Sequence, residues 1–151
     1  MSSSIRIASA CADDYRQCAA IMAGSEPWLT LQRDFEQCRV FLDRPGTELF
    51  VAWEGSRLAG FLLLAAYGFA GSPYVASIGV AAEARGQGIG SQLLRFAENR
   101  FADRRTIFLL VSSFNHRAQK LYRRLGYEFV GELKDYLVPG HSELILQKRI
   151  S

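Results

Sequence analysis

The sequence is poor in cysteine, and the cysteines that it has fit no disulfide or metal framework. Cys11, Cys18 and Cys38 are an odd number, include no Cys-x-x-Cys pair and have no histidine close by in the sequence. Disulfide scaffolds and zinc sites need paired or regularly spaced ligands, so we expect neither, and no metal. Cys11 and Cys18 lie seven residues apart in an expected helix, which favours small buried side chains. Reduced thiols are typical of a cytoplasmic protein.

Long hydrophobic runs are also absent. No apolar stretch reaches the ~18 to 20 residues that a membrane helix needs. The first residues, Met1 to Arg6, lack the basic-then-apolar pattern of a signal segment. We therefore expect neither export nor membrane association.

The overall composition is that of one globular domain. The 151 residues are 49% hydrophobic and 22% charged, which is enough for one core in a chain too short for two. The formal net charge is only +3, and the densest basic run, Arg100 to Arg105, is interrupted by Asp103. A nucleic-acid ligand is therefore not expected. We expect a single domain over residues 1–151.

Hydrophobic periodicity and turn residues predict the element order β-α-α-β-β-β-α-β-α-β-β. The predicted strands are residues 5–8, 48–53, 58–67, 74–80, 106–113, 127–136 and 142–149. The predicted helices are residues 13–23, 30–42, about 90–101 and 115–125. Residues 68–73 are expected to form a loop. Because the strand-helix-strand unit in the middle favours a parallel pair and the ends favour antiparallel hairpins, we expect an α/β fold with a mixed sheet and helices on its faces.

The most informative local feature is a cluster of glycines. Gly86, Gly88 and Gly90 occupy alternate positions between a strand end and a helix start. Bare backbone there lets a ligand approach the first amide N–H groups of the helix, which carry partial positive charge and have no partner within the helix. Arg85 adds a cation with several N–H donors. The cluster predicts a phosphate or pyrophosphate site; a glycine-rich turn without a ligand is the alternative.

Two other kinds of phosphate loop do not fit this cluster. It lacks the Gly-Lys-Ser/Thr ending of a nucleoside triphosphate loop. Its spacing matches Gly-x-Gly-x-x-Gly poorly, and the next strand, 106–113, offers only hydroxyls where a dinucleotide site expects a ribose-binding acid.

A second motif lies on the helix that begins at Asn115. Asn115, Ala118 and Tyr122 are spaced i, i+3 and i+7, so they share one helix face, while Leu121 and Leu125 share another. The small Ala118 leaves room for a ligand along the helix, and Tyr122 would direct its hydroxyl toward that ligand. Taken alone, the pattern also fits a tyrosine that is merely half buried.

Together the two motifs closely resemble those of the GNAT N-acetyltransferases. The resemblance rests on Arg85-x-x-Gly88-x-Gly90 after an apolar strand, followed by Asn115-x-x-Ala118-x-x-Leu121-Tyr122-x-x-Leu125-Gly126-Tyr127. It covers about residues 74–137. It implies about seven strands with four helices, and a sheet that splays open between the strand ending at Val80 and the strand ending near Ser113. Gly79 is expected to mark a bulge that helps to open it.

The resemblance also implies acetyl-coenzyme A as co-substrate and direct attack by a primary amine. Tyr122 would be the general acid that protonates the departing sulfur. The cofactor-binding residues implied are Ile78, Gly79, Val80, Arg85, Gly86, Gln87, Gly88, Ile89, Gly90, Ser91, Asn115, Ala118 and Tyr122.

The acceptor side of the site is less well defined. Some relatives place a glutamate base five residues before the motif asparagine, where this sequence has Leu110. The candidates for a base are therefore Glu26, His141 and Glu143, or a chain of water molecules.

The expected acceptor-binding residues are Glu26, Trp28, His141 and Glu143. The first two follow the first helix, and the last two lie near Pro139-Gly140 between the last strands, positions that border the acceptor pocket in this family. With Asp135, the glutamates would make the pocket acidic and suited to a cationic amine. The alternatives are a simple helix-linking turn and a solvated loop.

The resemblance leaves several properties of the protein open. The acceptor would be a small-molecule amine or a protein or peptide amine, and the protein a monomer or homodimer. The alternative within the same fold is a catalytically silent sensor or scaffold that binds acyl-coenzyme A. A binding module without a cofactor is a further alternative.

Overall fold

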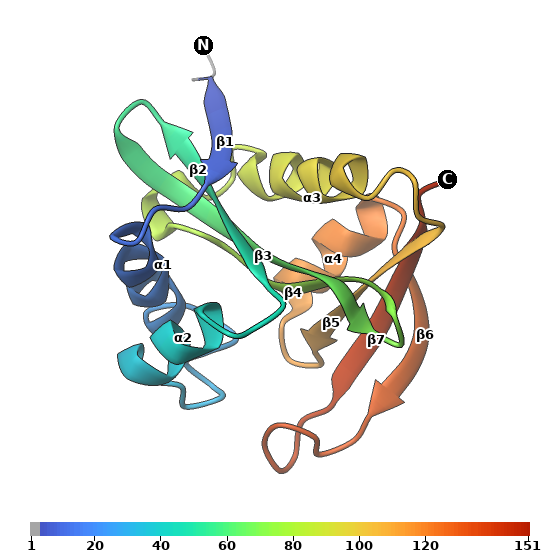
Figure 1. The fold of residues 1–151 in the computed structure, drawn as a ribbon. Coiled ribbons are helices and arrows are strands. Elements are labelled where there is room, and N and C mark those ends of the chain that lie inside the picture. Colours follow the sequence, from blue (N-terminus) through green and yellow to red (C-terminus); the bar gives the residue numbers. More distant parts are fainter. Residues whose placement is uncertain (1–3) are drawn as a thin grey trace.

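The computed structural model of the protein describes residues 4–151, which form the predicted order of elements (Figure 1). The strands are β1 Ile5–Ser9, β2 Glu48–Glu54, β3 Arg57–Phe69, β4 Ser72–Val80, β5 Thr106–Ser112, β6 Glu128–Leu133 and β7 Glu143–Arg149. The helices are α1 Asp14–Ala23, α2 Phe35–Leu42, α3 Ile89–Arg100 and α4 His116–Arg124, with a short 3-10 turn, η1, at Ala82–Ala84.

All seven strands form one sheet in the order β1-β2-β3-β4-β5-β7-β6. The β4–β5 pair is parallel and every other neighbouring pair is antiparallel. The predicted mixed α/β fold is therefore confirmed. The parallel pair is the one joined through α3, as expected for a strand-helix-strand unit.

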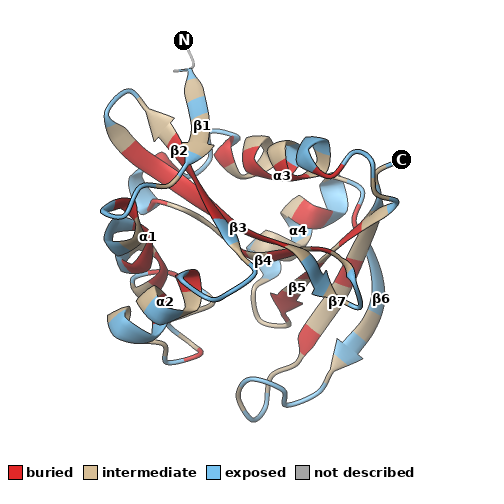
Figure 2. Ribbon diagram, in the orientation of Figure 1, coloured by how far each residue is buried: buried red, intermediate tan, exposed pale blue. Residues whose placement is uncertain are grey.

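Two hydrophobic cores lie on opposite faces of the sheet. Helices α3 and α4 cover one face, and α1 and α2 cover the other (Figure 1). Strand β3 serves both cores, since Leu62 and Leu64 pack toward α3 while Phe61 and Leu63 pack toward α1 and α2. This central strand is accordingly buried along most of its length (Figure 2).

The second helix begins five residues later than the predicted start at Thr30, at Phe35. Asp34 and Gln37 form a reciprocal capping box, with Asp34 Oδ1 accepting from the Gln37 amide at 2.8 Å and Gln37 Oε1 accepting from the Asp34 amide at 2.9 Å. Leu31 is buried in the irregular segment before the cap. In the sequence, Leu31 therefore looks like the first residue of the apolar face of the helix. This is why the predicted start of the helix was wrong.

Three smaller predictions are also corrected. Residues 68–73 are not an open loop, because β3 continues to Phe69 and β4 starts at Ser72, leaving a two-residue turn. Strand β6 ends at Leu133 and does not reach residue 136. Cys11 precedes α1 and is exposed, whereas Cys18 and Cys38 are buried as expected.

The parallel pair opens part of the way along its length. Strands β4 and β5 are in register only at Tyr74–Phe108 and Val75–Leu109, although both strands continue. The register of β3 against β4 shifts at the next residue, Ala76, which has no partner on β3. A bulge bends the strand that carries it. The expected splaying is thus confirmed, but the bulge is at Ala76 and not at Gly79.

Gly79 is required for a different reason. A Cβ at this position would overlap with the ring of Phe61, which is fully buried between β4 and the helices α1 and α2. We expect Gly79→Ala to lower the free energy of unfolding by about 1–3 kcal/mol, because a core ring must move. Denaturant unfolding measures this change. Gly24→Ala is the matched control, since its Cβ would make only an ordinary 3.5 Å contact; equal losses in both variants would refute the explanation.

Candidate active site

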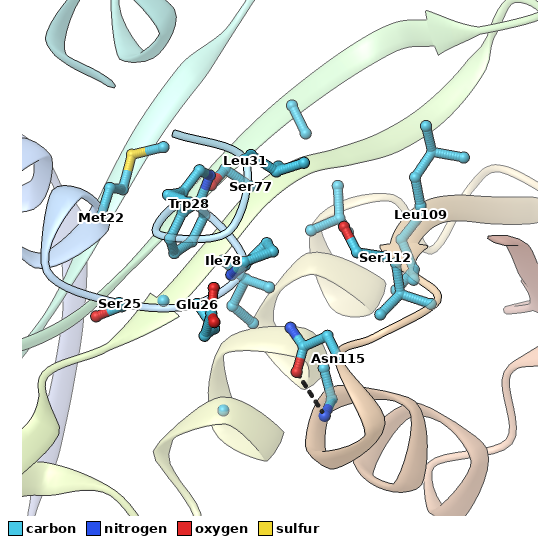
Figure 3. A pocket seen from close by; sticks show the side chains of 18 of the residues that line it. Met22, Ser25, Glu26, Trp28, Leu31, Ser77, Ile78, Leu109, Ser112 and Asn115 are labelled. Carbon is cyan, nitrogen blue, oxygen red and sulfur yellow. Dashed lines mark hydrogen bonds between the residues drawn. The ribbon is translucent and has the colours of Figure 1, made fainter. Parts of the chain in front are cut away.

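One large cleft begins where β4 and β5 separate. Its volume of about 1870 Å³ exceeds that of a typical pocket for one small ligand, so it can hold a long cofactor together with a second substrate. It is bordered by β4 and β5, the starts of α3 and α4, the segment between α1 and α2, and the segment between β6 and β7. In Figure 3, Trp28 and Ile78 lie on one side of the opening and Leu109 and Ser112 on the other.

The glycine cluster forms one end of this cleft. Gly86 and Gly88 have φ values of +78° and +80°, and the position of a Cβ on either would be open space. Gly88 is the N-cap of α3 and offers no side chain to its first N–H groups. These donors therefore have no side-chain cap, and a ligand remains their predicted partner. Gly90 has a packing role, because its Cβ would lie 3.2 Å from Cδ2 of Leu121 on α4.

The remaining residues of this motif do not all border the cleft. Ile89 and Ser91 border the cleft together with the glycines, whereas Gln87 does not. The Arg85 guanidinium donates from Nη2 to Ser25 Oγ at 3.0 Å and from Nε to the Val80 carbonyl at 3.3 Å. Arg85 thus connects the glycine cluster to the segment that follows α1.

The second motif borders the cleft from α4. Asn115 Oδ1 caps the helix by accepting from the Ala118 amide at 3.3 Å (Figure 3). Gly126 follows the helix end with a φ of +95°. Tyr122 is 6% exposed and lines the cleft. Burial raises the pKa of its hydroxyl, which has no hydrogen-bond partner within residues 4–151. The hydroxyl therefore stays protonated at neutral pH and free to donate.

A buried carboxylate faces the cleft from β7. Glu143 is 4% exposed and accepts a 2.8 Å hydrogen bond from Ser112 Oγ, its register partner on β5. Burial raises its pKa, more than the Ser112 hydrogen bond and the charge of His141 lower it. Ser112 lies two residues after Leu110 and so on the same face of β5. Glu143 therefore supplies a carboxylate beside the position that Leu110 leaves apolar.

Of the other predicted acceptor-binding residues, two border the cleft and one does not. Glu26 borders the cleft, but its carboxylate accepts from the Thr30 amide at 2.9 Å and the Thr30 hydroxyl at 2.7 Å. Trp28 also borders it, with its ring 6.1 Å from that of Phe61. His141 does not border the cleft, and its ring packs edge-on against Phe114 at 4.7 Å. The structure thus brings together Glu26, Trp28 and Glu143.

The prediction of an acidic pocket is wrong in one part. Asp135 does not border the cleft, since its Oδ1 accepts from the Gly140 amide at 2.7 Å and closes the turn between β6 and β7. Two arginines, Arg33 and Arg44, border it on the acceptor side. The acceptor half is therefore mixed in charge.

The sequence interpretation also missed several residues of the cleft. Arg117, Lys120 and Arg124 border it from α4, and their i, i+3, i+7 spacing could have indicated a common basic face. Ser77 borders it from β4, and its Oγ is buried with no hydrogen-bond partner in the described part of the chain. No local sequence signal marks Ser77.

Other kinds of site find no support in residues 4–151. No three His, Cys, Asp or Glu side chains there are grouped to hold a metal ion. Burial raises the pKa of the Cys18 thiol to about 12, which disfavours the nucleophilic thiolate. Across the same residues, none of the helices combines the length and apolar character required to cross a bilayer.

Comparisons with known proteins agree with this geometry. The sequence model of the acetyltransferase (GNAT) family matches residues 9–127. A search of curated protein sequences gives no significant match.

Solved structures with similar folds cover nearly the whole chain. The ribosomal-protein-S18-alanine N-acetyltransferase of Escherichia coli is 19% identical, with a TM-score of 0.76 over 98% of this chain and 95% of that one. An N-acetyltransferase from Staphylococcus aureus is 20% identical, with a TM-score of 0.77 over 99% and 100%. An aminoglycoside 6'-N-acetyltransferase complexed with coenzyme A is 17% identical, with a TM-score of 0.75 over 97% of each chain.

Proposed function

Because the chain belongs to the GNAT acetyltransferase family, we propose that it transfers the acetyl group of acetyl-coenzyme A directly to a primary amine, with Tyr122 as general acid. One observation carries the proposal. The uncapped start of α3, the opening between β4 and β5, and the free Tyr122 hydroxyl all border the same cleft.

The residues present fit coenzyme A. The α3 amides of Gly88 to Ser91 and the basic face of α4 suit its phosphates, since helix N–H groups and cations both favour anions. Ile78 to Val80 pair with β3 but lie beyond the last β4–β5 pair, so their backbone groups that face away from β3 are open to hydrogen bonds with the pantetheine amides. Asn115 and Ala118 border the same path, and the unpartnered Ser77 hydroxyl could pair with either substrate.

The chain's own groups can assist both ends of the reaction. When bound, acetyl-coenzyme A supplies an activated acetyl thioester. A backbone N–H of β4 near Val80 would stabilise negative charge growing on the thioester oxygen. Tyr122 would donate its proton to the departing sulfur, which its protonated state at neutral pH permits. Holding the amine and thioester in line contributes the rest of the acceleration.

We assign the general base to Glu143. A base must accept the amine's proton, so it needs a carboxylate that reaches the cleft and is not held elsewhere. Glu26 has both carboxylate oxygens occupied by Thr30, and His141 faces Phe114. Within residues 4–151, only one oxygen of Glu143 accepts a hydrogen bond, from Ser112. Its raised pKa also brings it closer to neutrality, which favours proton transfer.

The first test is stabilisation by the cofactor. At a concentration of about 100 Kd, acetyl-coenzyme A should raise the melting temperature by roughly 5–10 °C, because the native state alone would bind it. Gly88→Ala should lose most of this shift, since a side chain would enter the space before α3. Gly46→Ala is the matched control, because Gly46 has a similar φ of +81° and open surroundings but lies outside the cleft.

Thiol release then separates turnover from binding. Release of coenzyme A that depends on an added amine supports the acetyltransferase. A melting shift without release from a broad panel of small amines and peptides would instead favour the silent acyl-coenzyme A-binding protein. The absence of any shift would refute the proposed cofactor.

A further inference from the structure

We propose that the acceptor is a primary amine on an apolar, ring-sized body that also carries an anionic group, and that polycations such as polyamines are poor acceptors. This inference rests on the proposed function, because it names the acceptor class of the same cleft. The similar structures do not decide it, since one is named for a protein acceptor and another for an aminoglycoside.

Exposed apolar side chains gather at the acceptor end of the cleft. Of the seven exposed large hydrophobic side chains in residues 4–151, four border the cleft. They are Leu29 (54% exposed), Val40 (59%), Tyr136 (61%) and Leu137 (39%). They come from the segment after α1, from α2 and from the segment between β6 and β7. An apolar rim gathered from three separate segments indicates a surface that binds apolar matter.

The walls inside this rim carry aromatic rings. Trp28, Phe41 and Tyr74 all border the cleft, and Trp28 lies beside the bulged part of β4 (Figure 3). Tyr74 is half-buried, and burial raises the pKa of its hydroxyl to about 12. Ring faces favour stacked or edge-on contact with an apolar, ring-sized group. Ring faces also attract ammonium groups, so discrimination against a polycation must come from the arginines of this region.

The free charges of this region include two cations. Neither Arg33 nor Arg44 forms an ion pair with a carboxylate of residues 4–151. The Arg44 guanidinium lies 4.3 Å from the ring centre of Phe41, at the edge of the cleft. Stacking on a ring leaves the in-plane N–H donors of a guanidinium available to an anion. Arg44 is therefore arranged to bind a carboxylate or a similar group.

The carboxylates that border the cleft do not outnumber its cations on this side. Glu36 pairs with Arg39 at 3.4 Å, and Glu26 keeps its negative charge while it accepts from Thr30. Glu143 is buried, so Arg33 and Arg44 offset the charges of Glu26 and Glu143 and leave no net attraction for a polycation. Arg44 and Glu143 act on Tyr74 in opposite senses, since the first lowers the pKa of its hydroxyl and the second raises it. Both side chains border the cleft together with Tyr74, so an acceptor whose amine reaches Glu143 can present an anionic group to Arg44.

Four acceptors test the two parts of this inference. Phenylalanine and 4-(2-aminoethyl)benzoate carry a ring and a carboxylate, 2-phenylethylamine carries the ring alone, and spermidine is a polycation. We expect the better ring acid to exceed 2-phenylethylamine in kcat/KM by about tenfold, the size of one good ionic contact. Spermidine should be poorer still. Coenzyme A release measures all four.

The variant Arg44→Gln tests whether Arg44 binds the anionic group of the acceptor. This variant should lower kcat/KM with the ring acid by about tenfold and so remove its preference over 2-phenylethylamine. Arg39→Gln is the matched control, because Arg39 also lies on this side of the fold but pairs with Glu36 and does not border the cleft. An unchanged preference in Arg44→Gln would overturn the role of Arg44.

A direct binding measurement keeps this inference separate from the proposed function. Calorimetric titration of the coenzyme A-bound protein with the same amines reports acceptor affinity without turnover. Tighter binding of the ring acid supports the acceptor class even if no amine releases thiol, a result that would refute the acetyltransferase alone. Tighter binding or faster turnover of spermidine would overturn the acceptor class and leave the acetyltransferase standing.

Discussion

Replacing Tyr122 by phenylalanine should lower kcat by about tenfold or more, a modest value for loss of a general acid. The affinity for acetyl-coenzyme A should change little, because the ring remains and the hydroxyl has no partner in the described chain that its loss would leave unsatisfied. Steady-state coenzyme A release gives kcat, and the melting shift with acetyl-coenzyme A gives the affinity.

Tyr67→Phe is the matched control for this prediction. It removes the same hydroxyl from a side chain that is 74% exposed and lies outside the cleft, so kcat should not change. Because burial raises the pKa of Tyr122, activity should not fall through loss of its proton until well above neutral pH. Unchanged turnover in Tyr122→Phe would remove Tyr122 from the mechanism and require a water molecule as the acid.

The elements with local signals were predictable from the sequence. The cap at Asn115 and the stop at Gly126 fix α4 within a few residues, and both appear in the structure as expected. The start of α2 was misplaced because burial of Leu31 depends on tertiary packing, although the capping pair Asp34 and Gln37 is visible in the sequence. The bulge at Ala76 could not be predicted, since it is defined by its pairing with β3.

The cofactor half of the candidate site was also predictable from local sequence signals, whereas the acceptor half depends on tertiary packing. The cofactor half consists of a strand end, a glycine turn and two helix starts, whose residues are close in sequence and carry their own spacing. The acceptor half is assembled from four separate segments, residues 26–44, 74–77, 110–112 and 133–143. Ser112 and Glu143 are 31 residues apart and meet only because β7 lies between β5 and β6. Contacts between residues so far apart in the chain produce no periodic pattern in the sequence, so this contact could not be predicted from it.

The position of Glu143 leads to the second prediction with a large expected effect. Glu143→Gln keeps the size of the side chain and an acceptor for the Ser112 hydroxyl, but it cannot take a proton. We expect kcat/KM at neutral pH to fall by about tenfold or more, as is typical for loss of a general base. Glu26→Gln should cost less, because the Glu26 carboxylate is held by Thr30.

The pH profile distinguishes a base from a merely structural carboxylate. A base acts when deprotonated, so kcat/KM of the unmodified protein should rise with pH through the pKa of Glu143, which burial places above its ordinary value. Glu143→Gln should lose this limb. Ser112→Ala should move it to higher pH, because the Ser112 hydrogen bond lowers that pKa. Glu132→Gln, which also loses a carboxylate bonded to a serine but lies outside the cleft, should keep the profile unchanged. If the limb persists in Glu143→Gln, the base lies elsewhere, and the buried pair of Ser112 and Glu143 only joins β5 to β7.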